Sequence, residues 1–485
     1  MLPVAYRVGM LAAALSSHYD GQFIGIMLTA SHNALPDNGV KLVAPTGEML
    51  PSSWEHVAEV VANCPMDELE TELAKHFGAI GKCSVVVGMD TRPSGPALRE
   101  MVMKGVRKLG GEVVEIGVVT TPELHTAVAR LNREPHTVSQ LEDDYIVGLA
   151  SAFQPVVGVH NKVKIVVDCA NGVGALKVQK LKKKMAKTGY ELIVVNGGEA
   201  ELNHNCGADY VKTGNCPPHG DYKPDAVTHF ASLDGDADRL VYFTFTDAGT
   251  FQLIDGDRMS ALIAMAIKKL LQKSGLADSI TMGVVQTAYA NGGSTEFIEK
   301  TLGIPIVCTP TGVKHLHKAA SGFDIGIYFE ANGHGTVLFS ENATKTLRTT
   351  RNEHSELLLA VSRLANQLVG DGIADMLLVE AMLKITKQSL KDWAALYKDR
   401  PSCLIKTVVK DRTKLKTTDA DRSITEPAGL QTEIDRITAC VRGGRAFARP
   451  SGTEDVVRIF SEATTAEDAA KLAADISAVI AGYGI

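Results

Sequence analysis

The chain has 485 residues, too many for one hydrophobic core, which predicts about three or four domains. Hydrophobic residues make up 45% of it and charged residues 22%, a balance typical of soluble globular proteins that excludes disordered and fibrous classes. The net charge of -6 argues against a nucleic-acid-binding protein, which would carry a basic excess. No stretch reaches the roughly 18 apolar residues that a membrane span needs.

The eight cysteines are scattered, without a C-x-x-C pair or a histidine at zinc-finger spacing. This pattern favours reduced thiols in a cytoplasmic protein over a disulfide framework or a structural zinc site. The apolar stretch at 8–15 is a weak match to a signal peptide, and we interpret it instead as an amphipathic first helix that packs under the following strand.

Short β-branched runs alternate with segments of helical period along most of the chain. The strand-like runs are 24–28, 85–88, 113–116, 164–168, 192–195, 240–245, 282–286 and 325–329, and the helical segments include 96–109 and 259–273. Such alternation predicts α/β units with largely parallel strands, in which sites form at the carboxyl ends of the strands.

We place three α/β units at 1–135, 136–255 and 256–375. Loops near 132–144 and 338–351 mark boundaries between units. A helical stretch at 354–390 straddles the next join. The last unit, 376–485, is smaller and closes with a helix at 466–480.

The first chemical motif is IMLTASHNALPDNGVK, in which a buried strand ends at Ser31 and His32. A serine hydroxyl is a poor nucleophile until a neighbouring group activates it, and the Asp-Asn-Gly turn brings Lys41 back toward the serine. We therefore expect covalent chemistry on Ser31, with an Asn-rich turn as the alternative. Residues 90–92, Asp-Thr-Arg, either orient this loop or form a plain turn.

The second motif, LDGDADR, places Asp234, Asp236 and Asp238 at alternate positions, so that their carboxylates can converge on one ion. Hard oxygen ligands of this kind suit Mg²⁺. An EF-hand is excluded because it would need Gly in place of Arg239 and Glu in place of Phe245. The remaining alternative is a solvated acidic turn.

A second acidic pair follows at Asp255 and Asp257, next to the start of a predicted helix. One of these side chains is better interpreted as an N-cap than as a metal ligand.

The third motif, FEANGHGT, ends a strand at Glu330 and continues through Ala331, Asn332 and His334. Glu and Asn supply the acceptors and donors that vicinal hydroxyls of a sugar require. A hairpin-like turn would need the same glycines, and for this motif taken alone that alternative is favoured.

The fourth motif combines a guanidinium, two hydroxyls and loop amides, which together can bind the oxygens of a phosphate. A second arginine follows shortly after it and can close the site. Its members are Arg449, Pro450, Ser451, Gly452, Thr453 and Arg458. The alternative is a capped helix start.

Together the four motifs predict phosphoryl transfer between two positions of one sugar phosphate. A cation would neutralise a phosphate on Ser31, and His32 or Lys41 would take or return the proton of the sugar hydroxyl. The fourth motif would bind the other phosphate of the sugar.

In this order and over nearly the whole chain, the motifs resemble those of the α-D-phosphohexomutase superfamily. Within it, residues 29–33, 202–209 and 330–334 resemble the phosphoacetylglucosamine mutases most closely. The glucose and mannose mutases of the superfamily typically carry Ser where Asn332 stands, so an acetamido sugar is favoured.

The resemblance implies three mixed-sheet α/β domains and a smaller C-terminal α+β domain around one central cleft. It implies a phosphoserine at Ser31, one Mg²⁺ held by that group with the three aspartates of the second motif, and an N-acetylglucosamine 1,6-bisphosphate intermediate. Substrate would bind through Arg239 and the residues of the third and fourth motifs. The expected protein is a cytoplasmic monomer or weak dimer on the route to UDP-N-acetylglucosamine, acting on hexosamine phosphates without nucleic-acid or membrane partners.

Two departures from the family pattern stand out. Its members begin with a strand and a Gly-Thr-Ala-Gly-Phe-Arg type loop, whereas this chain opens almost at the first helix, so we expect an N-terminally short first domain. The Pro that usually follows Ser-His-Asn is Ala34 here. The departures leave open a non-catalytic sugar-phosphate-binding paralogue, and a phosphoglucomutase or phosphomannomutase is the other alternative.

Overall fold

The computed structural model describes residues 1–134, 136–159, 161–225, 227–452 and 454–485. The described residues divide into two compact units. The first contains 1–256, 332–337 and 347–391, and the second contains 257–331, 338–346 and 392–485. The division into four domains that we drew from the sequence, and the boundaries between them, stay a prediction.

The first sheet has the strand order β2-β1-β3-β4, with β1, β3 and β4 parallel and β2 antiparallel at the edge. Its elements are α1 Leu2–His18, β1 Phe23–Leu28, β2 Val40–Val43, η1 Ser52–Trp54, α2 Glu55–Asn63, α3 Leu69–Phe77, β3 Ser84–Met89, α4 Gly95–Lys108, β4 Glu112–Val118 and α5 Thr121–Leu131.

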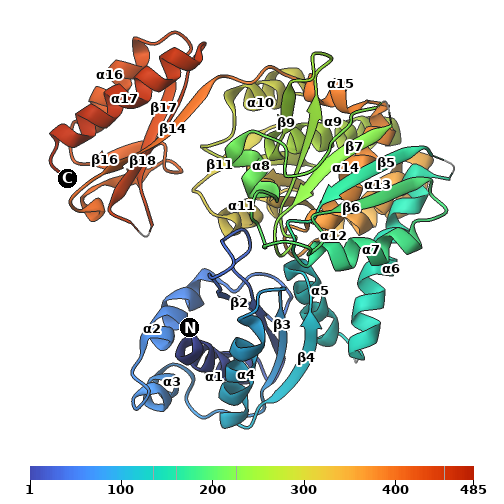
Figure 1. The fold of residues 1–485 in the computed structure, drawn as a ribbon, viewed down its shortest axis with the longest axis vertical. Coiled ribbons are helices and arrows are strands. Elements are labelled where there is room, and N and C mark those ends of the chain that lie inside the picture. Colours follow the sequence, from blue (N-terminus) through green and yellow to red (C-terminus); the bar gives the residue numbers. More distant parts are fainter. Residues whose placement is uncertain (135, 160, 226, 453) are drawn as a thin grey trace. The chain divides into compact units, whose positions relative to one another are not determined.

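Helices cover both faces of this sheet (Figure 1), and as a result β3 is buried along its whole length and β1 is buried beyond Phe23. Ile24 and Ile26 face a core shared with α1, α2, α3 and α4, while Met27 and Val86 face Leu124 and other residues of α5. The predicted first helix is confirmed as α1, but its middle is not amphipathic, because residues 8–16 are all buried.

The second sheet has the order β6-β5-β7-β8-β9, parallel from β6 to β7 and antiparallel from β7 to β9. Its elements are α6 Val138–Val157, β5 Val163–Asp168, α7 Gly174–Lys184, β6 Tyr190–Val195, α8 Ala208–Gly214, β7 Thr228–Leu233, β8 Leu240–Phe245 and β9 Phe251–Ile254. The later helices α13 Glu353–Leu364 and α14 Gly372–Thr386 pack against α6.

The third sheet has the order β11-β10-β12-β13, with β10, β11 and β12 parallel. Its elements are α9 Gly256–Ser274, β10 Met282–Thr287, α10 Gly292–Glu296, the π-helical turn η2 Phe297–Thr301, β11 Ile306–Thr309, α11 Val313–Ala320, β12 Ile325–Phe329, β13 Gly335–Phe339 and α12 Glu341–Thr350.

The C-terminal part contains an antiparallel sheet β14-β18-β17 and a hairpin of β15 and β16. Its elements are α15 Leu390–Ala394, β14 Ser402–Val408, η3 Arg412–Lys414, β15 Lys416–Thr418, β16 Ser423–Glu426, α16 Leu430–Ala439, β17 Arg445–Pro450, β18 Val456–Glu462 and α17 Ala466–Gly482. The expected fold class, three mixed-sheet α/β parts followed by a smaller α+β part, is confirmed.

Three local predictions were wrong. The predicted loop near 132–144 contains the start of α6, where Thr137 and Gln140 form a capping box. The stretch near 338–351 contains α12, which buries Ala343 and Leu347 on one face. The helical stretch at 354–390 is interrupted between α13 and α14, where Asp371 caps the second helix.

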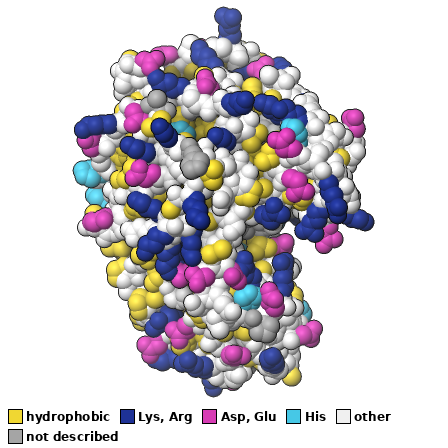
Figure 2. Space-filling model, turned by 90° about the vertical axis from the view of Figure 1, so that its right-hand side faces the viewer, with side chains coloured by type: hydrophobic (Ala, Val, Ile, Leu, Met, Phe, Trp, Pro, Cys, Tyr) yellow, Lys and Arg dark blue, Asp and Glu magenta, His cyan; other side chains and the backbone are white. Residues whose placement is uncertain are grey.

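The surface carries charges of both signs, mixed over the face shown in Figure 2. Positive partners for an anionic ligand must therefore come from particular loops rather than from the net charge of the molecule. Among the described residues, none of the helices has both the length and the apolar character needed to cross a membrane.

Candidate active site

The loop after β1 places Ser31 in a buried position with an unusual backbone conformation. Ser31 has a φ of 48°, in the left-handed region that non-glycine residues seldom adopt, and its side chain is almost fully buried. The Ser31 amide donates to the Thr29 hydroxyl at 2.9 Å, and that hydroxyl donates to Asp90 at 2.8 Å. Side chains from neighbouring strand ends therefore hold the serine in place.

Arg92 holds the same loop in place through hydrogen bonds to its backbone. Its fully buried guanidinium donates to the carbonyl oxygens of Ser31 at 3.2 Å, Asn33 at 2.9 Å, Ala34 at 2.6 Å and Asp37 at 2.8 Å. Its Nε donates to a carboxylate oxygen of Asp90 at 3.0 Å. Of the two interpretations of residues 90–92, the structure favours orientation of the serine loop over a plain turn.

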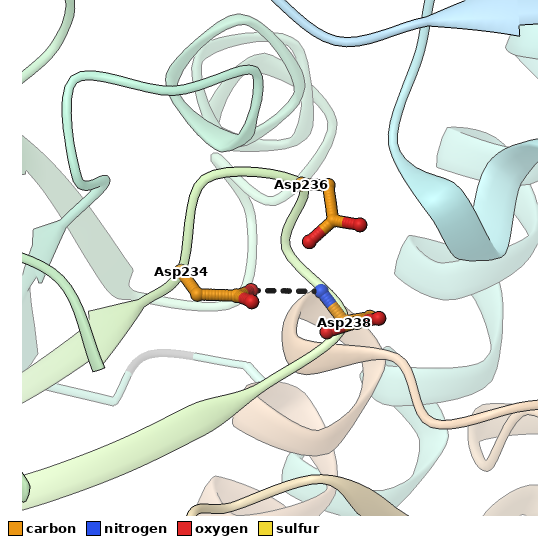
Figure 3. Close-up of side chains that lie close together, drawn as sticks. All are labelled: Asp234, Asp236 and Asp238. Carbon is orange, nitrogen blue, oxygen red and sulfur yellow. Dashed lines mark hydrogen bonds between the residues drawn. The ribbon is translucent and has the colours of Figure 1, made fainter. Parts of the chain in front are cut away.

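The loop between β7 and β8 carries the three aspartates (Figure 3). All three are buried, and one carboxylate oxygen of each lies within 4.8 Å of those of the other two. Asp234 Oδ1 accepts hydrogen bonds from the amides of Asp238 at 3.1 Å and Arg239 at 3.2 Å, which closes the loop on itself. The predicted convergence of the three side chains is therefore confirmed.

This cluster fits a divalent cation better than a solvated acidic turn, because all three aspartates are buried. Asp234 Oδ2 and Asp236 Oδ1 are buried and accept no hydrogen bond from any described residue. Burial and the neighbouring Asp238 and Asp236 raise the pKa of Asp234 well above its usual range. Buried carboxylate oxygens without donors are costly, and a hard cation such as Mg²⁺ would offset that cost.

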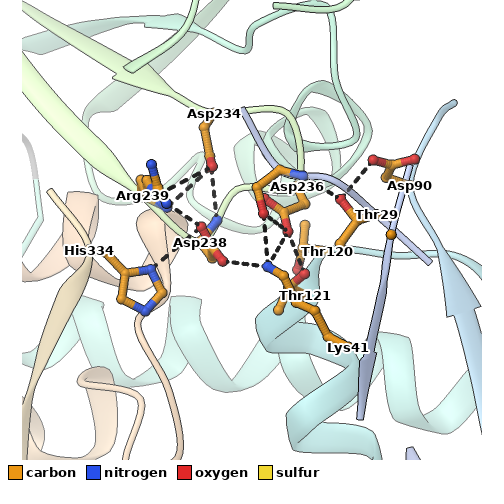
Figure 4. A network of polar contacts seen from close by, with 12 residues as sticks. Thr29, Lys41, Asp90, Thr120, Thr121, Asp234, Asp236, Asp238, Arg239 and His334 are labelled. Atoms are coloured by element: carbon orange, nitrogen blue, oxygen red, sulfur yellow. Dashed lines mark hydrogen bonds and ion pairs between the residues drawn. The ribbon is translucent and has the colours of Figure 1, made fainter. Parts of the chain in front are cut away.

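Lys41 meets the aspartate cluster directly (Figure 4), and Ser31 contacts the same cluster. Ser31 Oγ lies 3.0 Å from Asp236 Oδ2, and Lys41 Nζ donates to Ser31 Oγ at 2.8 Å. The same ammonium bridges Asp236 at 2.9 Å and Asp238 at 2.8 Å. The backbone is equally close, because a Cβ added at Gly235 would lie 2.6 Å from the Ser31 carbonyl oxygen.

The charges in this centre are strongly coupled. Burial would lower the pKa of Lys41, but the carboxylates of Asp236 and Asp238 outweigh it, and the pKa is raised. Burial would likewise raise the pKa of Asp238, yet Lys41, His334 and Arg239 hold it well below its usual range. The Lys41 ammonium and the ionised carboxylate of Asp238 thus form the charged pair of this centre, with the serine hydroxyl at its edge.

Arg239 and the glycine-rich loop before β13 flank the cluster. Arg239 Nε lies 3.8 Å from Asp238 Oδ1, and His334 Nδ1 lies 3.5 Å from the same oxygen. The Gly333 carbonyl accepts from the Leu240 amide at 3.1 Å, and Asn332 Oδ1 accepts from the His334 amide at 3.0 Å. The second and third motifs therefore adjoin each other in this unit.

His32 is half-buried beside the same charges. Burial, followed by the positive charge of Arg239, lowers its pKa below the ordinary value. A neutral imidazole has the protonation state that a general base requires. Glu330 and Ala331, at the end of β12, are partly buried.

The fourth motif lies in the other unit, at the turn between β17 and β18. Arg449 and Arg458 stand directly opposite each other in the sheet. Arg449 Nε donates to the Tyr289 hydroxyl at 2.9 Å, and the guanidinium lies 5.5 Å from the centre of that ring. Arg458 Nε is buried without a hydrogen-bond partner among the described residues. Two adjacent guanidinium groups favour an anion here.

The loop of this motif is partly ordered by its own backbone. The Ser451 amide donates to the Val456 carbonyl at 2.9 Å, and Arg412 donates to the Gly452 carbonyl at 3.1 Å. Pro450 pairs with Val457 at the end of β17. Thr453, also predicted as a phosphate ligand, lies outside the described residues.

Two further side chains at the serine centre escaped the sequence-based prediction. Thr121, at the start of α5, donates to Asp236 Oδ2 at 2.6 Å. Asn203 donates to the carbonyl oxygens of Ser31 at 2.8 Å and Asn33 at 2.9 Å. Asn203 stands in a segment that the family resemblance singled out, whereas no pattern in the sequence pointed to Thr121.

The acidic pair at 255–257 has structural partners, and the N-cap role predicted for one of its members stays a prediction. The Asp255 carboxylate pairs with Lys212, and Asp257 Oδ2 accepts from the backbone amide of Asn291 at 2.8 Å. The hydrogen bond to Asn291 shows that Asp257 supports the start of α10 as well as lying in the first turn of its own helix.

Family models match four successive parts of the chain. The model described as "Phosphoglucomutase/phosphomannomutase, alpha/beta/alpha domain I" matches residues 5–64 and 66–140, and "Phosphoacetylglucosamine mutase AMG1, domain II" matches 141–241. Domain III of the same mutase matches 255–388, and the "Phosphoglucomutase/phosphomannomutase, C-terminal domain" matches 404–479.

Curated proteins and solved structures are similar over nearly the whole chain. The phosphoacetylglucosamine mutase of Sus scrofa is 43% identical over 98% of this chain and 90% of its own length, and that of Homo sapiens is 41% identical with the same coverage. A structure of Aspergillus fumigatus N-acetylphosphoglucosamine mutase in complex with GlcNAc-6P and magnesium superposes with a TM-score of 0.94 at 44% identity, covering 100% of this chain and 93% of that one.

Proposed function

The chain belongs to the phosphoacetylglucosamine mutase family, and on this premise we propose that it interconverts N-acetylglucosamine 6-phosphate and N-acetylglucosamine 1-phosphate. The observation that carries the proposal is the contact of Ser31 Oγ with both Asp236 and Lys41, at 3.0 Å and 2.8 Å. This contact joins a nucleophile, a cation site and a proton donor in one buried centre.

In the proposed reaction a phosphorylated Ser31 gives its phosphoryl group to the free hydroxyl of the hexosamine phosphate. The bond from phosphorus to Ser31 Oγ breaks, a bond from phosphorus to the sugar oxygen forms, and the hydroxyl proton passes to the enzyme. The resulting 1,6-bisphosphate reorients and returns its other phosphoryl group to Ser31. The atoms balance without a further reactant, so the bisphosphate acts as intermediate and activator.

Mg²⁺ would be held by Asp234, Asp236 and Asp238 together with the phosphate on Ser31. When bound, it would neutralise the charge of the transferring phosphoryl group. The unpartnered oxygens of Asp234 and Asp236 support this assignment.

The residues of the chain itself handle the protons and the positioning. Lys41 Nζ, already donating to Ser31 Oγ, supplies the proton that the serine oxygen needs when the phosphoryl group leaves. His32, with its lowered pKa, is the candidate base for the sugar hydroxyl. Arg92 and Asn203 keep the serine loop in place through the Ser31 carbonyl.

Substrate recognition is proposed for two groups of residues. Arg239, Glu330, Ala331, Asn332 and His334 would bind the sugar, since Arg239 and His334 lie beside the aspartate cluster and the other three belong to the same motif as His334. The phosphate that does not react would be bound by Arg449, Pro450, Ser451, Gly452, Thr453 and Arg458, which we call the phosphate clamp. The paired Arg449 and Arg458 support this assignment.

We further propose that the protein works in the cytoplasm, as a monomer or weak dimer, and supplies the 1-phosphate for UDP-N-acetylglucosamine synthesis. Its eight cysteines are free thiols, which suits a reducing compartment.

The test is turnover of N-acetylglucosamine 6-phosphate by the purified protein with Mg²⁺ and a trace of sugar 1,6-bisphosphate. We expect the protein to form N-acetylglucosamine 1-phosphate, and to do so faster than it forms the 1-phosphates of glucose and mannose from their 6-phosphates. Binding of the sugar phosphate without any conversion would instead support a non-catalytic paralogue, and a preference for glucose would support a phosphoglucomutase.

A further inference from the structure

Three basic side chains stand in register across the C-terminal sheet, one on each strand. Lys406 of β14 lies directly opposite Arg458 of β18, and Arg458 lies directly opposite Arg449 of β17. Directly opposite residues project to the same face, and neighbouring strands are about 4.8 Å apart, so the row is about 10 Å long. Like charges directly opposite each other destabilise a sheet, and a bound anion would remove that cost.

The row lies on the face of the sheet that α17 does not cover. The alternate residues Ile405, Val457 and Ile459 belong to the core that includes Leu472 and Ile476 of α17. Because side chains alternate between the faces of a strand, Lys406 and Arg458 project away from that helix. In Figure 1, α16 and α17 run along one side of β14, β17 and β18.

Among the described residues, Lys406 has only an exposed ion pair to hold it. Arg449 is bound to Tyr289, whereas Lys406 Nζ lies 3.4 Å from Glu454 Oε2, and both of these side chains are more than half exposed. Exposed ion pairs of this kind contribute little and exchange easily. Glu454 belongs to the same turn as the phosphate clamp, so the carboxylate and an incoming phosphate would compete for one ammonium.

We propose that Lys406 is a third cation of the phosphate clamp, and that Glu454 pairs with Lys406 until a phosphate monoester displaces it. The inference rests on the proposed function, because it extends the clamp of Arg449 and Arg458. A phosphate dianion attracts the three cations more strongly than a single carboxylate does, and its oxygens can accept from a lysine as well as from two guanidinium groups. Because Glu454 and the phosphate repel each other, Lys406 can bind only one of them at a time.

The proposal predicts effects of opposite sign for its two residues. Lys406→Gln is expected to raise both the Kd for inorganic phosphate and the KM for N-acetylglucosamine 6-phosphate by about 3- to 10-fold, with kcat unchanged within about 2-fold. Glu454→Gln is expected to lower the same Kd by about 2- to 3-fold, because the competing carboxylate is gone. A residue with only a structural role would not tighten binding when it is removed.

The matched control is Lys471→Gln, which removes one exposed positive charge from α17 of the same domain and should change neither constant. If Lys406→Gln and Lys471→Gln weakened phosphate binding equally, the proposal would be overturned, because the loss of one positive charge anywhere on the domain would explain the effect. Weaker phosphate binding in Glu454→Gln would also overturn it.

A third variant separates this inference from the proposed function. If Arg458→Gln weakens phosphate binding strongly while Lys406→Gln does not, the clamp stands and the role of Lys406 is wrong. If Arg458→Gln also leaves phosphate binding and KM unchanged, the clamp itself is wrong, and the inference is overturned with it.

Discussion

Arg92 is the side chain whose replacement tests most sharply how the serine loop is held. It lies outside the reacting centre, yet its guanidinium binds five backbone carbonyls of residues 31–37 and the Asp90 carboxylate. We expect Arg92→Lys to keep the positive charge and to lose the geometry, because an ammonium donates at most three hydrogen bonds from a single point.

The contacts give the size of the effect. The arginine makes five hydrogen bonds of 3.2 Å or less, so a lysine leaves at least two of these acceptors without a charged donor. Each such loss costs about 1.5–3 kcal/mol, or about 3–6 kcal/mol together. We assume that half of the upper figure, about 3 kcal/mol, raises the activation barrier by misplacing Ser31. Since each 1.36 kcal/mol of barrier changes the rate tenfold, kcat should fall about 100-fold.

The assay is steady-state turnover of N-acetylglucosamine 6-phosphate with Mg²⁺ and bisphosphate, at a temperature where circular dichroism shows the variant folded. Arg99→Lys is the matched control, because Arg99 forms a partly exposed ion pair with Glu115 at 3.3 Å and should tolerate lysine within about 2-fold. A kcat for folded Arg92→Lys equal to that of the unmodified protein would refute the positioning role.

Three further predictions concern the metal and pH. Asp238→Asn should raise the Mg²⁺ concentration needed for half-maximal activity by at least about 10-fold, and an unchanged titration would contradict the cluster. Chelation should abolish turnover and added Mg²⁺ should restore it, whereas activity that survives chelation would argue for another chemistry. Burial lowers the pKa of His125 from 6.5 to about 4, so its protonation favours the unfolded chain. The free energy of unfolding should thus fall by about 3 kcal/mol between pH 6.5 and 4, and His125→Gln should flatten that slope in denaturant titrations.

The strands and the chemical motifs could be predicted because their signals are local. The apolar run of β1, the alternate aspartates of LDGDADR and the paired basic residues around Ser-Gly-Thr each occupy a few consecutive residues. Ser31 and Asp236 follow strands of two different sheets, and packing between the first two sheet-containing parts of the first unit brings them together although 205 positions separate them.

What escaped prediction depends on contacts between distant segments or on competing local signals. Thr121 contacts Asp236 across 115 positions, and nothing in its own neighbourhood marks it. Polar residues on the exposed face of α12 concealed the spacing of Ala343 and Leu347, which its buried face requires. The row that includes Lys406 emerges only when three strands are in register, since a lone lysine in β14 carries no such information.

The proposed reaction depends above all on Ser31 as the residue that carries the phosphoryl group. The most direct measurement is phosphopeptide mapping of the protein after incubation with Mg²⁺ and sugar 1,6-bisphosphate, before and after a chase with N-acetylglucosamine 6-phosphate. We predict one phosphate on Ser31 that the chase removes in the unmodified protein, and neither phosphate nor turnover in Ser31→Ala. Turnover with Ser31 unphosphorylated throughout, or full activity of Ser31→Ala, would contradict the account.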